Sequence, residues 1–299
     1  VTLDIDAQKQ TEKYEFRLFS SCHNLGMLKN YVKKIYDALP FKRHLFQAVK
    51  RVLTPPEFIY RHLHFKGWFW VKSNADYKFK LYNQTIIENE IFWNGLFGRW
   101  EKESLKIWVK LAKKSRYIID VGANTGVYAL LAKAVSQHSV IFALEPHPHF
   151  FNILKRNIEV NNFIITPLDY AASNIEGSIT IDDYTGHAKG VEVKSITLKS
   201  LIESNNIPRI DLMKIDVETF EPEVLDGMGK YLQIFKPSLV IEILNDQVAD
   251  KIEELIEGVG YLKFNIDEIH GLTRVDRLKK SSSLNYLLAT KESINEIFI

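Results

Sequence analysis

The sequence contains very little cysteine, with Cys22 as the one thiol among 299 residues. A lone cysteine excludes an internal disulfide and a zinc site built from several cysteines. No apolar run approaches the ~18 consecutive residues that a membrane-spanning helix needs. The opening residues VTLDIDAQKQ have neither the basic start nor the apolar core of an export signal. We therefore expect a soluble, cytoplasmic protein without cysteine chemistry.

The sequence also lacks an excess of charge of either sign. Its 39 lysines and arginines stand against 37 aspartates and glutamates, which leaves a net charge of +2 and excludes a uniformly basic or acidic protein. Hydrophobic residues make up 46% of the chain and charged residues 25%, as in ordinary globular proteins. Intrinsic disorder as the main state is therefore excluded.

The charge is nevertheless unevenly distributed along the chain. Residues 1–115 hold 21 basic and 11 acidic side chains, whereas the remainder holds 18 and 26, so a charge of +10 is followed by −8. All five tryptophans lie between Trp68 and Trp108. We therefore predict a basic, aromatic-rich module over residues 1–100, for acceptor or partner binding, and a second domain over residues 101–299.

The first part reads as a mixed α+β extension. Helical spacing of apolar residues predicts one helix from Leu25 to Leu39 and another from Leu45 to Leu53. The segments FKGWFWVK and YKFKLYN flank the turn-like SNAD and predict a short hairpin, followed by a helix over 86–97.

From Tyr117 onward, short apolar strands alternate with helical patterns, beginning with YIIDVGANTG and VIFALEP. This alternation is typical of an α/β, doubly wound, mostly parallel sheet, in which ligands bind at the carboxyl ends of the strands. Apolar runs over 260–266 and 284–290 predict two final strands.

The segment DVGANTG, residues 120–126, lies between a predicted strand and a predicted helix. Its glycines would let a ligand approach the backbone. The dinucleotide fingerprint G-x-G-x-x-G and the phosphate loop ending in Gly-Lys-Ser/Thr are both absent. The turn therefore favours a ligand without a pyrophosphate, such as S-adenosylmethionine, over a merely structural role.

Two further strand ends carry acids. Glu145 ends VIFALEP, 25 residues after Asp120, where a carboxylate can accept hydrogen bonds from both hydroxyls of a ribose; a solvated glutamate is the alternative. Asp169 ends FIITPLD and could accept from an adenine amino group, or bond the backbone of its own loop. His147 and His149 have a metal-like spacing, but the helix start after them favours capping or packing at the adenosine edge.

The fourth strand, in DLMKIDVETFE, carries the densest charge. Strand alternation predicts that Lys214, Asp216 and Glu218 point to one side. Methyl transfer to a hydroxyl needs in-line alignment and a base, and a carboxylate beside another charge can be tuned for that role. Structural salt bridges are the alternative. Glu242 is a second base candidate, and metal-assisted deprotonation by Asp216 with Glu242 is a further one.

Taken together, these motifs resemble the FkbM family, a branch of the class I S-adenosylmethionine-dependent methyltransferases. The resemblance runs from about residue 100 to residue 244 and rests on IDVGANTGVYAL, FALEPHPHFFNILKRNIEVNN, SITLKSLI and DLMKIDVETFEPEVLDGM followed by KPSLVIEI. It implies a seven-stranded, Rossmann-like methyltransferase sheet with an extra hairpin within residues 171–197. It also implies S-adenosylmethionine as donor and S-adenosylhomocysteine as product, and no metal is expected. The predicted cofactor site contains Asp120, Gly122, Ala123, Asn124, Thr125, Gly126, Glu145, Pro146 and Asp169, and the predicted catalytic residues are Asp216, Glu218 and Lys214.

Two positions depart from the family pattern. The family usually has Gly where this chain has Thr219, and Asp where it has Lys199. Thr219 adds a side chain where the fourth strand turns into its helix, which would narrow the acceptor side. The departures therefore bear on the acceptor more than on the donor.

Residues 1–100 match the family poorly, and additions of this kind commonly select the substrate. One hypothesis is an acceptor platform of aromatic faces that stack on sugar rings and basic groups that bind acidic ones. Its candidate members are Trp68, Phe69, Trp70, Trp93, Trp100, Arg61, Lys66, Lys72 and Arg99. Packing against the sheet is the alternative for each tryptophan. The basic aromatic stretch FIYRHLHFKGWFWVK also resembles interfacial anchors, which predicts peripheral contact at the inner membrane face.

The family resemblance implies O-methylation, so we predict methyl transfer to a hydroxyl, above all of a sugar in a glycan, glycolipid or secondary metabolite. A nucleic-acid methyltransferase is one rival, but the chain lacks the Asn/Asp-Pro-Pro-aromatic motif and its acidic catalytic face would repel phosphate, so no nucleic acid is expected. A non-catalytic scaffold in a glycan-assembly complex is the other rival, and the intact Asp120, Glu145 and Asp216 argue against it.

Overall fold

The computed structural model describes residues 36, 40–72, 77–183 and 190–298, and divides the chain into two compact units, residues 1–55 and 56–299. In the first unit, α3 spans Lys42–Val52, which confirms the second predicted helix. Apart from Tyr36, the helix predicted over 25–39 lies outside the described residues, as do the SNAD turn and residues 184–189 of the predicted extra hairpin.

All other elements belong to the second unit. Its first part contains α4 (Glu57–Tyr60), β1 (Gly67–Lys72), β2 (Lys78–Asn83), α5 (Ile86–Asn94), α6 (Lys102–Ala112), β3 (Tyr117–Val121), α7 (Val127–Val135), β4 (Val140–Leu144), α8 (Pro148–Asn161) and β5 (Thr166–Leu168). There follow β6 (Ala171–Ala172), β7 (Gly177–Ile181), β8 (Val191–Ile196), α9 (Leu198–Ser204), β9 (Leu212–Ile215), α10 (Glu221–Asp226), α11 (Lys230–Phe235), β10 (Ser238–Glu242), α12 (Asp246–Leu255), β11 (Leu262–Asp267), β12 (Gly271–Val275), β13 (Asn285–Ala289) and α13 (Lys291–Phe298).

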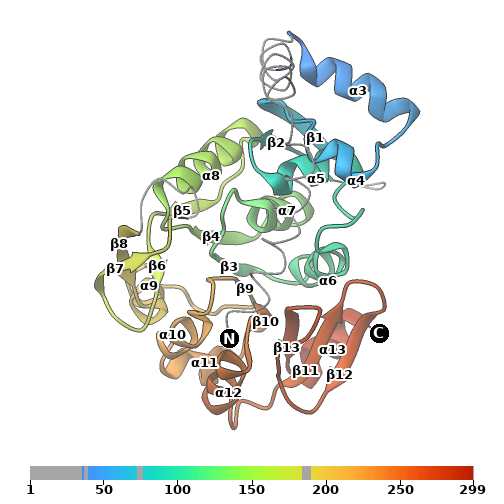
Figure 1. Ribbon diagram of the computed structural model, residues 1–299. Helices are drawn as coiled ribbons and strands as arrows, with labels where there is room; N and C mark the ends of the chain where they lie inside the picture. Colours follow the sequence, from blue (N-terminus) through green and yellow to red (C-terminus); the bar gives the residue numbers. More distant parts are fainter. Residues whose placement is uncertain (1–35, 37–39, 73–76, 184–189, 299) are drawn as a thin grey trace, which may run out of the picture. The chain divides into compact units, whose positions relative to one another are not determined.

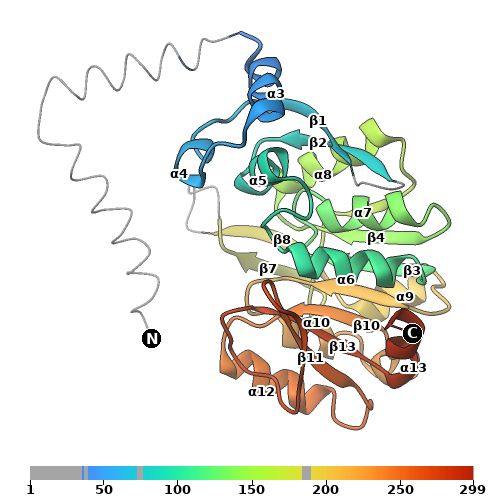
Figure 2. The ribbon, with the colours of Figure 1, turned by 90° about the vertical axis from the view of Figure 1, so that its right-hand side faces the viewer.

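The central sheet has eight strands in the order β12-β11-β13-β10-β9-β3-β4-β5. The five strands from β10 to β5 pair in parallel, whereas β13, β11 and β12 are joined by antiparallel pairings. In Figure 2, β4, β3, β10 and β11 follow one another down the view, from green to red. The doubly wound α/β prediction is confirmed, but the predicted count of seven strands is one too low, because β12 forms a hairpin with β11.

The inner strands are apolar and buried on both faces, as expected for parallel strands covered by helices on either side. Ile119, Val121, Met213 and Ile215 face one core, which α9, α10, α11 and α12 complete. By strand alternation, Asp120 and Lys214 point to the opposite face, toward α6 and α7. Because β3 and β9 pair with Asp120 in register with Lys214, the two polar residues are brought side by side.

A smaller three-stranded sheet, in the order β6-β8-β7, follows β5. The antiparallel pairing of β7 with β8 confirms the extra hairpin predicted within residues 171–197. Figure 1 shows these strands beside the carboxyl-terminal end of β5. None of the helices in the described part of the chain is long and apolar enough to cross a membrane.

The predicted hairpin is formed by β1 and β2, and it belongs to the same unit as the sheet. Two asparagines of α8 bind the backbone of β2. The Asn161 side chain accepts from Lys80 N (2.7 Å) and donates to Lys80 O (2.9 Å), and Asn157 accepts from Tyr82 N (2.9 Å). The boundary between the two compact units therefore falls after Pro55. That residues 1–100 bind an acceptor or a partner stays a prediction.

Two aromatic residues of the predicted platform are core residues. Phe69 and Trp93 are 4% and 1% exposed and pack in an aromatic cluster with Phe92, so for these two the prediction is wrong. Arg99 pairs with Glu57 at 2.6 Å. Phe69, Val71, Phe79 and Leu81 form the inner face of the hairpin because strand alternation sends them to the core.

On the outer face of the hairpin, Trp70 is 49% exposed and lies beneath the ammonium groups of Lys78 and Lys80, at 5.5 and 5.0 Å from its ring centroid. Trp70 is thus an exposed tryptophan of the stretch FIYRHLHFKGWFWVK, which was predicted to contact a membrane. Peripheral membrane contact stays a prediction.

Asn157 joins the hairpin to the turn after β3, because its amide also donates to Thr125 O at 2.8 Å. We expect Asn157→Ala to lower the free energy of unfolding by about 2–4 kcal/mol, since it leaves buried backbone groups unpaired. Asn152→Ala, at an exposed position of the same helix, is the control and should change stability little. Denaturant unfolding measures both, and equal effects of the two substitutions would contradict the role of Asn157.

Candidate active site

A cavity of about 370 Å³ lies at the carboxyl ends of β3, β4 and β9. It is the cleft that the doubly wound sheet predicts. Most of the predicted site residues line it: Asp120, Gly122, Ala123, Asn124, Thr125, Glu145, Pro146, Lys214, Asp216 and Glu218. Trp100, Tyr128, Phe150, Tyr170 and Phe220 complete much of its wall.

The turn after β3 brings the backbone of two strands into close approach. Gly122 has φ +76°, and a Cβ there would lie 1.9 Å from the carbonyl oxygen of Asp216. Gly126, at φ +93°, begins α7, and a Cβ there would meet Leu154. Gly126 has no side chain to cap the helix, and the Asp120 carboxylate instead accepts from Ala129 N at 2.9 Å. Asp120 is thus a capping residue as well as a cleft residue.

Glu145 closes the turn from the next strand. Its two carboxylate oxygens accept from Asn124 N (2.7 Å) and His147 N (2.8 Å). Burial raises the pKa of Glu145 to about 7, although these two backbone hydrogen bonds oppose the shift. Burial likewise raises the pKa of Asp120 to about 7. Each Glu145 oxygen retains a second lone pair for a ligand hydroxyl.

The turn is supported from outside the sheet by Glu88 of α5, which is fully buried. One oxygen of Glu88 accepts from the Thr125 hydroxyl, and the other accepts from Thr85 N at 2.8 Å in a capping box. The helix α5, which follows the β1–β2 hairpin, therefore helps to hold the turn of the predicted cofactor site.

Lys214 is at the centre of a buried charge cluster. Its ammonium donates to Asp216 (3.0 Å) and to Asn285 of β13 (3.2 Å), and it lies 5.2 Å from the ring of Tyr128. Tyr128 in turn donates to the Glu101 carboxylate. Burial alone would lower the pKa of Lys214, but the surrounding carboxylates outweigh it and raise that pKa, so the lysine is charged.

Three other acidic residues near this lysine have raised pKa values. Burial, then repulsion from Asp216, raises the pKa of Glu242 to about 9, and burial raises the pKa of Glu101 as well. Burial and the nearby Asp216 also raise the pKa of Glu218. Asp216 is the carboxylate that contacts Lys214 directly, and 31% of its side chain is exposed. It therefore contacts the buried ammonium on one side and lines the cleft on the other.

Strand alternation does not extend to Glu218, because β9 ends at Ile215 and the backbone turns at Glu218 and Thr219, with φ of 53° and 82°. Such values favour glycine, which accounts for the glycine that the family usually has at the position of Thr219. The buried Glu221 carboxylate holds this turn, accepting from Val217 N (3.1 Å) and Thr219 N (3.3 Å). Glu218 nevertheless lines the cleft.

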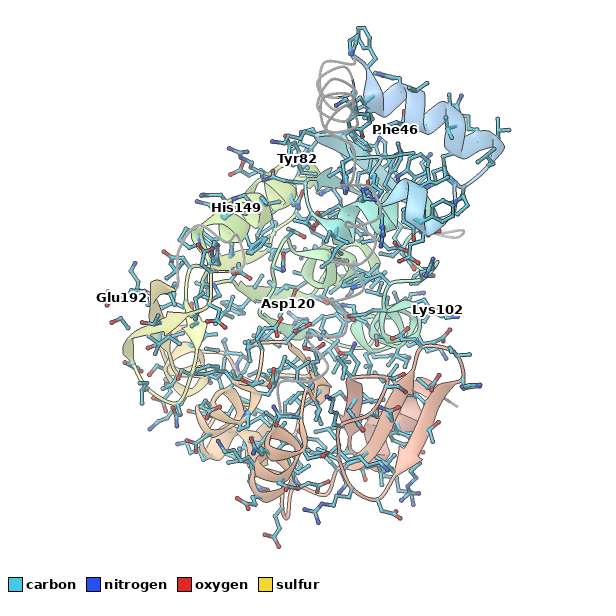
Figure 3. The ribbon with its side chains drawn as sticks, viewed as in Figure 1. Phe46, Tyr82, Lys102, Asp120, His149 and Glu192 are labelled. Atoms are coloured by element: carbon cyan, nitrogen blue, oxygen red, sulfur yellow. The ribbon has the colours of Figure 1, made fainter. Side chains whose placement is uncertain are left out.

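Of the two histidines after Glu145, His147 caps α8, which confirms the capping interpretation for this residue. His147 Nδ1 accepts from His149 N at 3.2 Å at the start of α8, and Nε2 lies 3.2 Å from the Asp183 carboxylate. Within the described residues, no group of three or more His, Cys, Asp and Glu side chains is arranged to hold a metal ion. Figure 3 shows His149 at the start of α8 and Asp120 among the side chains at the end of β3.

Two predicted cofactor residues do not line the cleft: Gly126, which begins α7, and Asp169, which lies in the loop after β5. The Asp169 side chain is 52% exposed and lies 3.7 Å from the Lys194 ammonium. The next residues, Tyr170, Ala171 and Ala172, line the cleft instead, because the chain turns from β5 into β6 at this point.

Sequence reasoning missed Glu88, Glu101, Tyr128 and Asn285. Tyr128 sits in an apolar helical pattern that reads as core, and the other three act across long sequence distances. No local motif marks them. Glu101 begins α6 in a left-handed conformation (φ 42°), but the chain offers no signal of this before the fold is known.

The close approach at Gly122 gives a direct test of the turn. Gly258 has the same φ of +76°, and a Cβ there would have nothing within 4 Å, so Gly258→Ala isolates the conformational cost, about 1–2 kcal/mol. Gly122→Ala adds a clash with the Asp216 backbone and should lose at least about 3 kcal/mol in denaturant unfolding. Similar losses for both variants would refute the crowding argument.

The raised pKa of Glu145 predicts a pH dependence of stability. Between its usual value of 4.5 and about 7, the folded state binds a proton that the unfolded state has released, so this group's contribution falls as pH rises. Glu145→Gln cannot ionise. Relative to wild type it should gain up to about 3 kcal/mol as pH rises from 4.5 to 7, on top of a constant loss from one unmatched N–H.

Thermal unfolding of both proteins across this range measures the difference. Glu254→Gln, at an exposed position of α12, controls for the loss of one charge. A difference between Glu145→Gln and wild type that stays flat with pH would contradict the shift.

Known proteins that are similar to this chain are methyltransferases. A family model described as the methyltransferase FkbM domain matches residues 120–263. The hexuronic acid methyltransferase AglP of Haloferax volcanii is 30% identical over 158 residues, which cover 50% of this chain and 65% of AglP. The methyltransferase sdnD of Sordaria araneosa is 26% identical over 189 residues, which cover 48% of this chain and 73% of sdnD.

Among solved structures, the methyltransferase FkbM of Methylobacillus flagellatus is 18% identical, with a TM-score of 0.40, over 58% of this chain and 43% of that one. The chain thus spans less than two thirds of the length of AglP and less than half of this solved chain. The predicted resemblance is confirmed over residues 120–263, which match the methyltransferase FkbM domain.

Proposed function

We propose that this protein binds S-adenosylmethionine and transfers its methyl group to a hydroxyl of a sugar. The observation that carries the proposal is that Glu145, at the end of β4, and Asp216, just after β9, line one cavity together with the glycine turn after β3. A ribose-binding acid and a candidate base on one cleft are what the reaction requires.

The residues of the cleft fit the donor. The backbone at Gly122 is open to a ligand because no side chain covers it, and Glu145 offers oxygens for ribose hydroxyls. Among the described residues, the buried Asn124 Oδ1 has no hydrogen-bond partner, so a ligand donor at this turn would satisfy it once the amide turns toward the cleft. When bound, the donor supplies an electrophilic methyl group on a cationic sulfonium.

The acids of the cleft suit that cation. Asp120, Glu145, Asp216 and Glu218 line it, whereas Lys214 is already engaged by Asp216 and Asn285. A positive ligand would relieve the repulsion among the carboxylates. The same acidity disfavours a nucleic-acid backbone.

Asp216 is the proposed base. The Lys214 ammonium contacts this carboxylate at 3.0 Å, and the partial exposure of Asp216 lets it reach an acceptor hydroxyl. Asp216 receives the hydroxyl proton while the oxygen forms its bond to the methyl carbon and the carbon–sulfur bond breaks, and the proton then passes to solvent. Lys214 and Glu218 are the charged neighbours of Asp216. Glu242 is the second candidate base.

A sugar is the proposed acceptor because AglP, to which this chain is similar, is named a hexuronic acid methyltransferase. The cleft wall also offers Trp100 and Phe220, whose aromatic faces suit the apolar faces of a sugar ring. Trp100 is the member of the predicted aromatic platform that reaches the cleft.

Calorimetric titration with S-adenosylhomocysteine tests the donor site. We expect micromolar affinity, about −8 kcal/mol, that weakens about tenfold or more in Glu145→Ala and is unchanged in Glu192→Ala, an exposed residue of β8. Asp216→Asn should bind within a few fold of wild type but lose about a hundredfold in methylation of sugar acceptors, followed by mass gain. Full activity of Asp216→Asn would remove this residue from the mechanism, and failure of the wild type to bind would sink the proposal.

A further inference from the structure

The outer face of the β1–β2 hairpin carries aromatic and basic side chains. It lies on the side opposite the buried Phe69, Val71, Phe79 and Leu81, because successive residues of a strand point to opposite faces. Three cross-strand pairs form it: Trp68 with Tyr82, Trp70 with Lys80, and Lys72 with Lys78. We call these six residues the hairpin face. Three of them are lysines and none is an acid, so the face has a formal charge of +3.

Part of the hairpin face is open to solvent. Trp70 is 49% exposed, and Lys72 and Lys78 are also exposed. The inner face of the hairpin packs in the core, and Asn157 and Asn161 of α8 bind the backbone of β2. The fold therefore uses the inner face of the hairpin and one edge of it, and an exposed aromatic side chain remains among cations on the outer face.

The fold changes which residues of the basic aromatic stretch FIYRHLHFKGWFWVK can meet a partner. Phe65, Phe69 and Val71 of this stretch are buried, so it cannot bind as a continuous anchor. Lys78 and Lys80 belong to β2, beyond the stretch, and the pairing of β1 with β2 brings them beside Trp70. The surface that a partner would meet is therefore formed by the hairpin and not by the linear sequence.

The contacts of Trp70 favour a lipid surface over a ligand that stacks on its ring. The ammonium groups of Lys78 and Lys80 lie 5.5 and 5.0 Å from the centroid of the indole ring. A nucleobase or a sugar would have to displace them in order to stack there. A membrane surface requires no such displacement, since the indole contacts the apolar boundary while the ammonium groups meet the lipid phosphates.

From these features we propose that the hairpin face binds the surface of an anionic phospholipid membrane, with Trp70 at the interface and the three lysines on the lipid phosphates. The contact is weak and reversible, because two short strands present one exposed tryptophan and three lysines. The proposal does not rest on the proposed function, since none of the six residues lines the cleft. It gives the protein a second binding surface apart from the cleft.

Co-sedimentation of the full chain with vesicles tests the proposal. The vesicles contain phosphatidylcholine alone, or phosphatidylcholine and phosphatidylglycerol at a ratio of about 3 to 1. Each lysine near an anionic surface contributes about fivefold, so we expect about tenfold or more tighter partitioning into the anionic vesicles. Raising the salt from about 0.05 to about 0.5 M should remove most of this preference. Equal partitioning into both kinds of vesicle, or none into either, would overturn the proposal.

Paired variants locate the contact. Lys78→Glu should weaken partitioning into anionic vesicles about tenfold or more, and Trp70→Ala about fivefold. Lys279→Glu and Ile269→Ala reverse a charge or remove an apolar side chain at exposed positions after and before β12, and should stay within about twofold of wild type. Equal behaviour of Lys78→Glu and Lys279→Glu would exclude the hairpin face. Lys78→Glu changes one exposed side chain, which keeps the test independent of the packing around Trp70.

Two further measurements separate this proposal from its alternatives. Lys78→Glu should bind S-adenosylhomocysteine as wild type does, because Lys78 does not line the cleft. If wild type binds anionic vesicles but not the cofactor product, the proposed function fails and the membrane proposal stands. A salt-sensitive gel shift with duplex RNA that Lys78→Glu abolishes, without binding to vesicles, would assign the face to another polyanion and refute the membrane proposal.

Discussion

The site depends on one buried ion pair, between the Lys214 ammonium and the Asp216 carboxylate at 3.0 Å. Lys214 is 1% exposed, and a buried ammonium is unfavourable unless carboxylates and hydrogen bonds surround it. Here the surroundings come from distant parts of the chain: Glu101 at the start of α6, Glu242 at the end of β10 and Asn285 in β13. Lys214 thus interacts both with the segment before the central sheet and with the antiparallel strand β13. Loss of Lys214 would leave several buried carboxylates to repel one another.

The same cluster determines what the cleft can hold. Lys214 neutralises part of the negative charge of the cleft, but Asp120 and Glu145 also line the cleft. Both are buried, and burial raises the pKa of each to about 7. Under the proposed function, a cationic donor stabilises their ionised forms, whereas its product, which has lost the sulfonium charge, does so less. The cleft therefore favours the donor over the product on electrostatic grounds, which assists product release.

Sequence patterns were sufficient where a site is built from local chain geometry. The glycine turn and Glu145 follow directly from strand ends, and the alternation of β9 places Lys214 on the same face of the sheet as Asp120, with which it is in register. They failed where the backbone leaves regular structure: Glu218 lies beyond β9 at positive φ, and Asp169 turns outward before β6. The strand β12 was missed because its residues, GLTRV, are mostly exposed and carry little apolar signal. Glu88 and Asn157 could not be predicted, because their hydrogen-bond partners lie in distant segments of the chain that meet only in the folded structure.

The turn after β9 explains how the chain tolerates its departure from the family pattern. A β-branched residue at φ 82°, as at Thr219, is strained by roughly 1–3 kcal/mol, and glycine would avoid that strain. Glu221 compensates, because its buried carboxylate binds the N–H groups of Val217 and Thr219 and fixes the turn that a glycine would leave flexible. Asp216 and Glu218 therefore project from a rigid segment. The turn after β3 keeps its glycines. Under the proposed function, the departure at Thr219 therefore lies on the acceptor side of the cleft, where a side chain and a fixed backbone replace an open glycine.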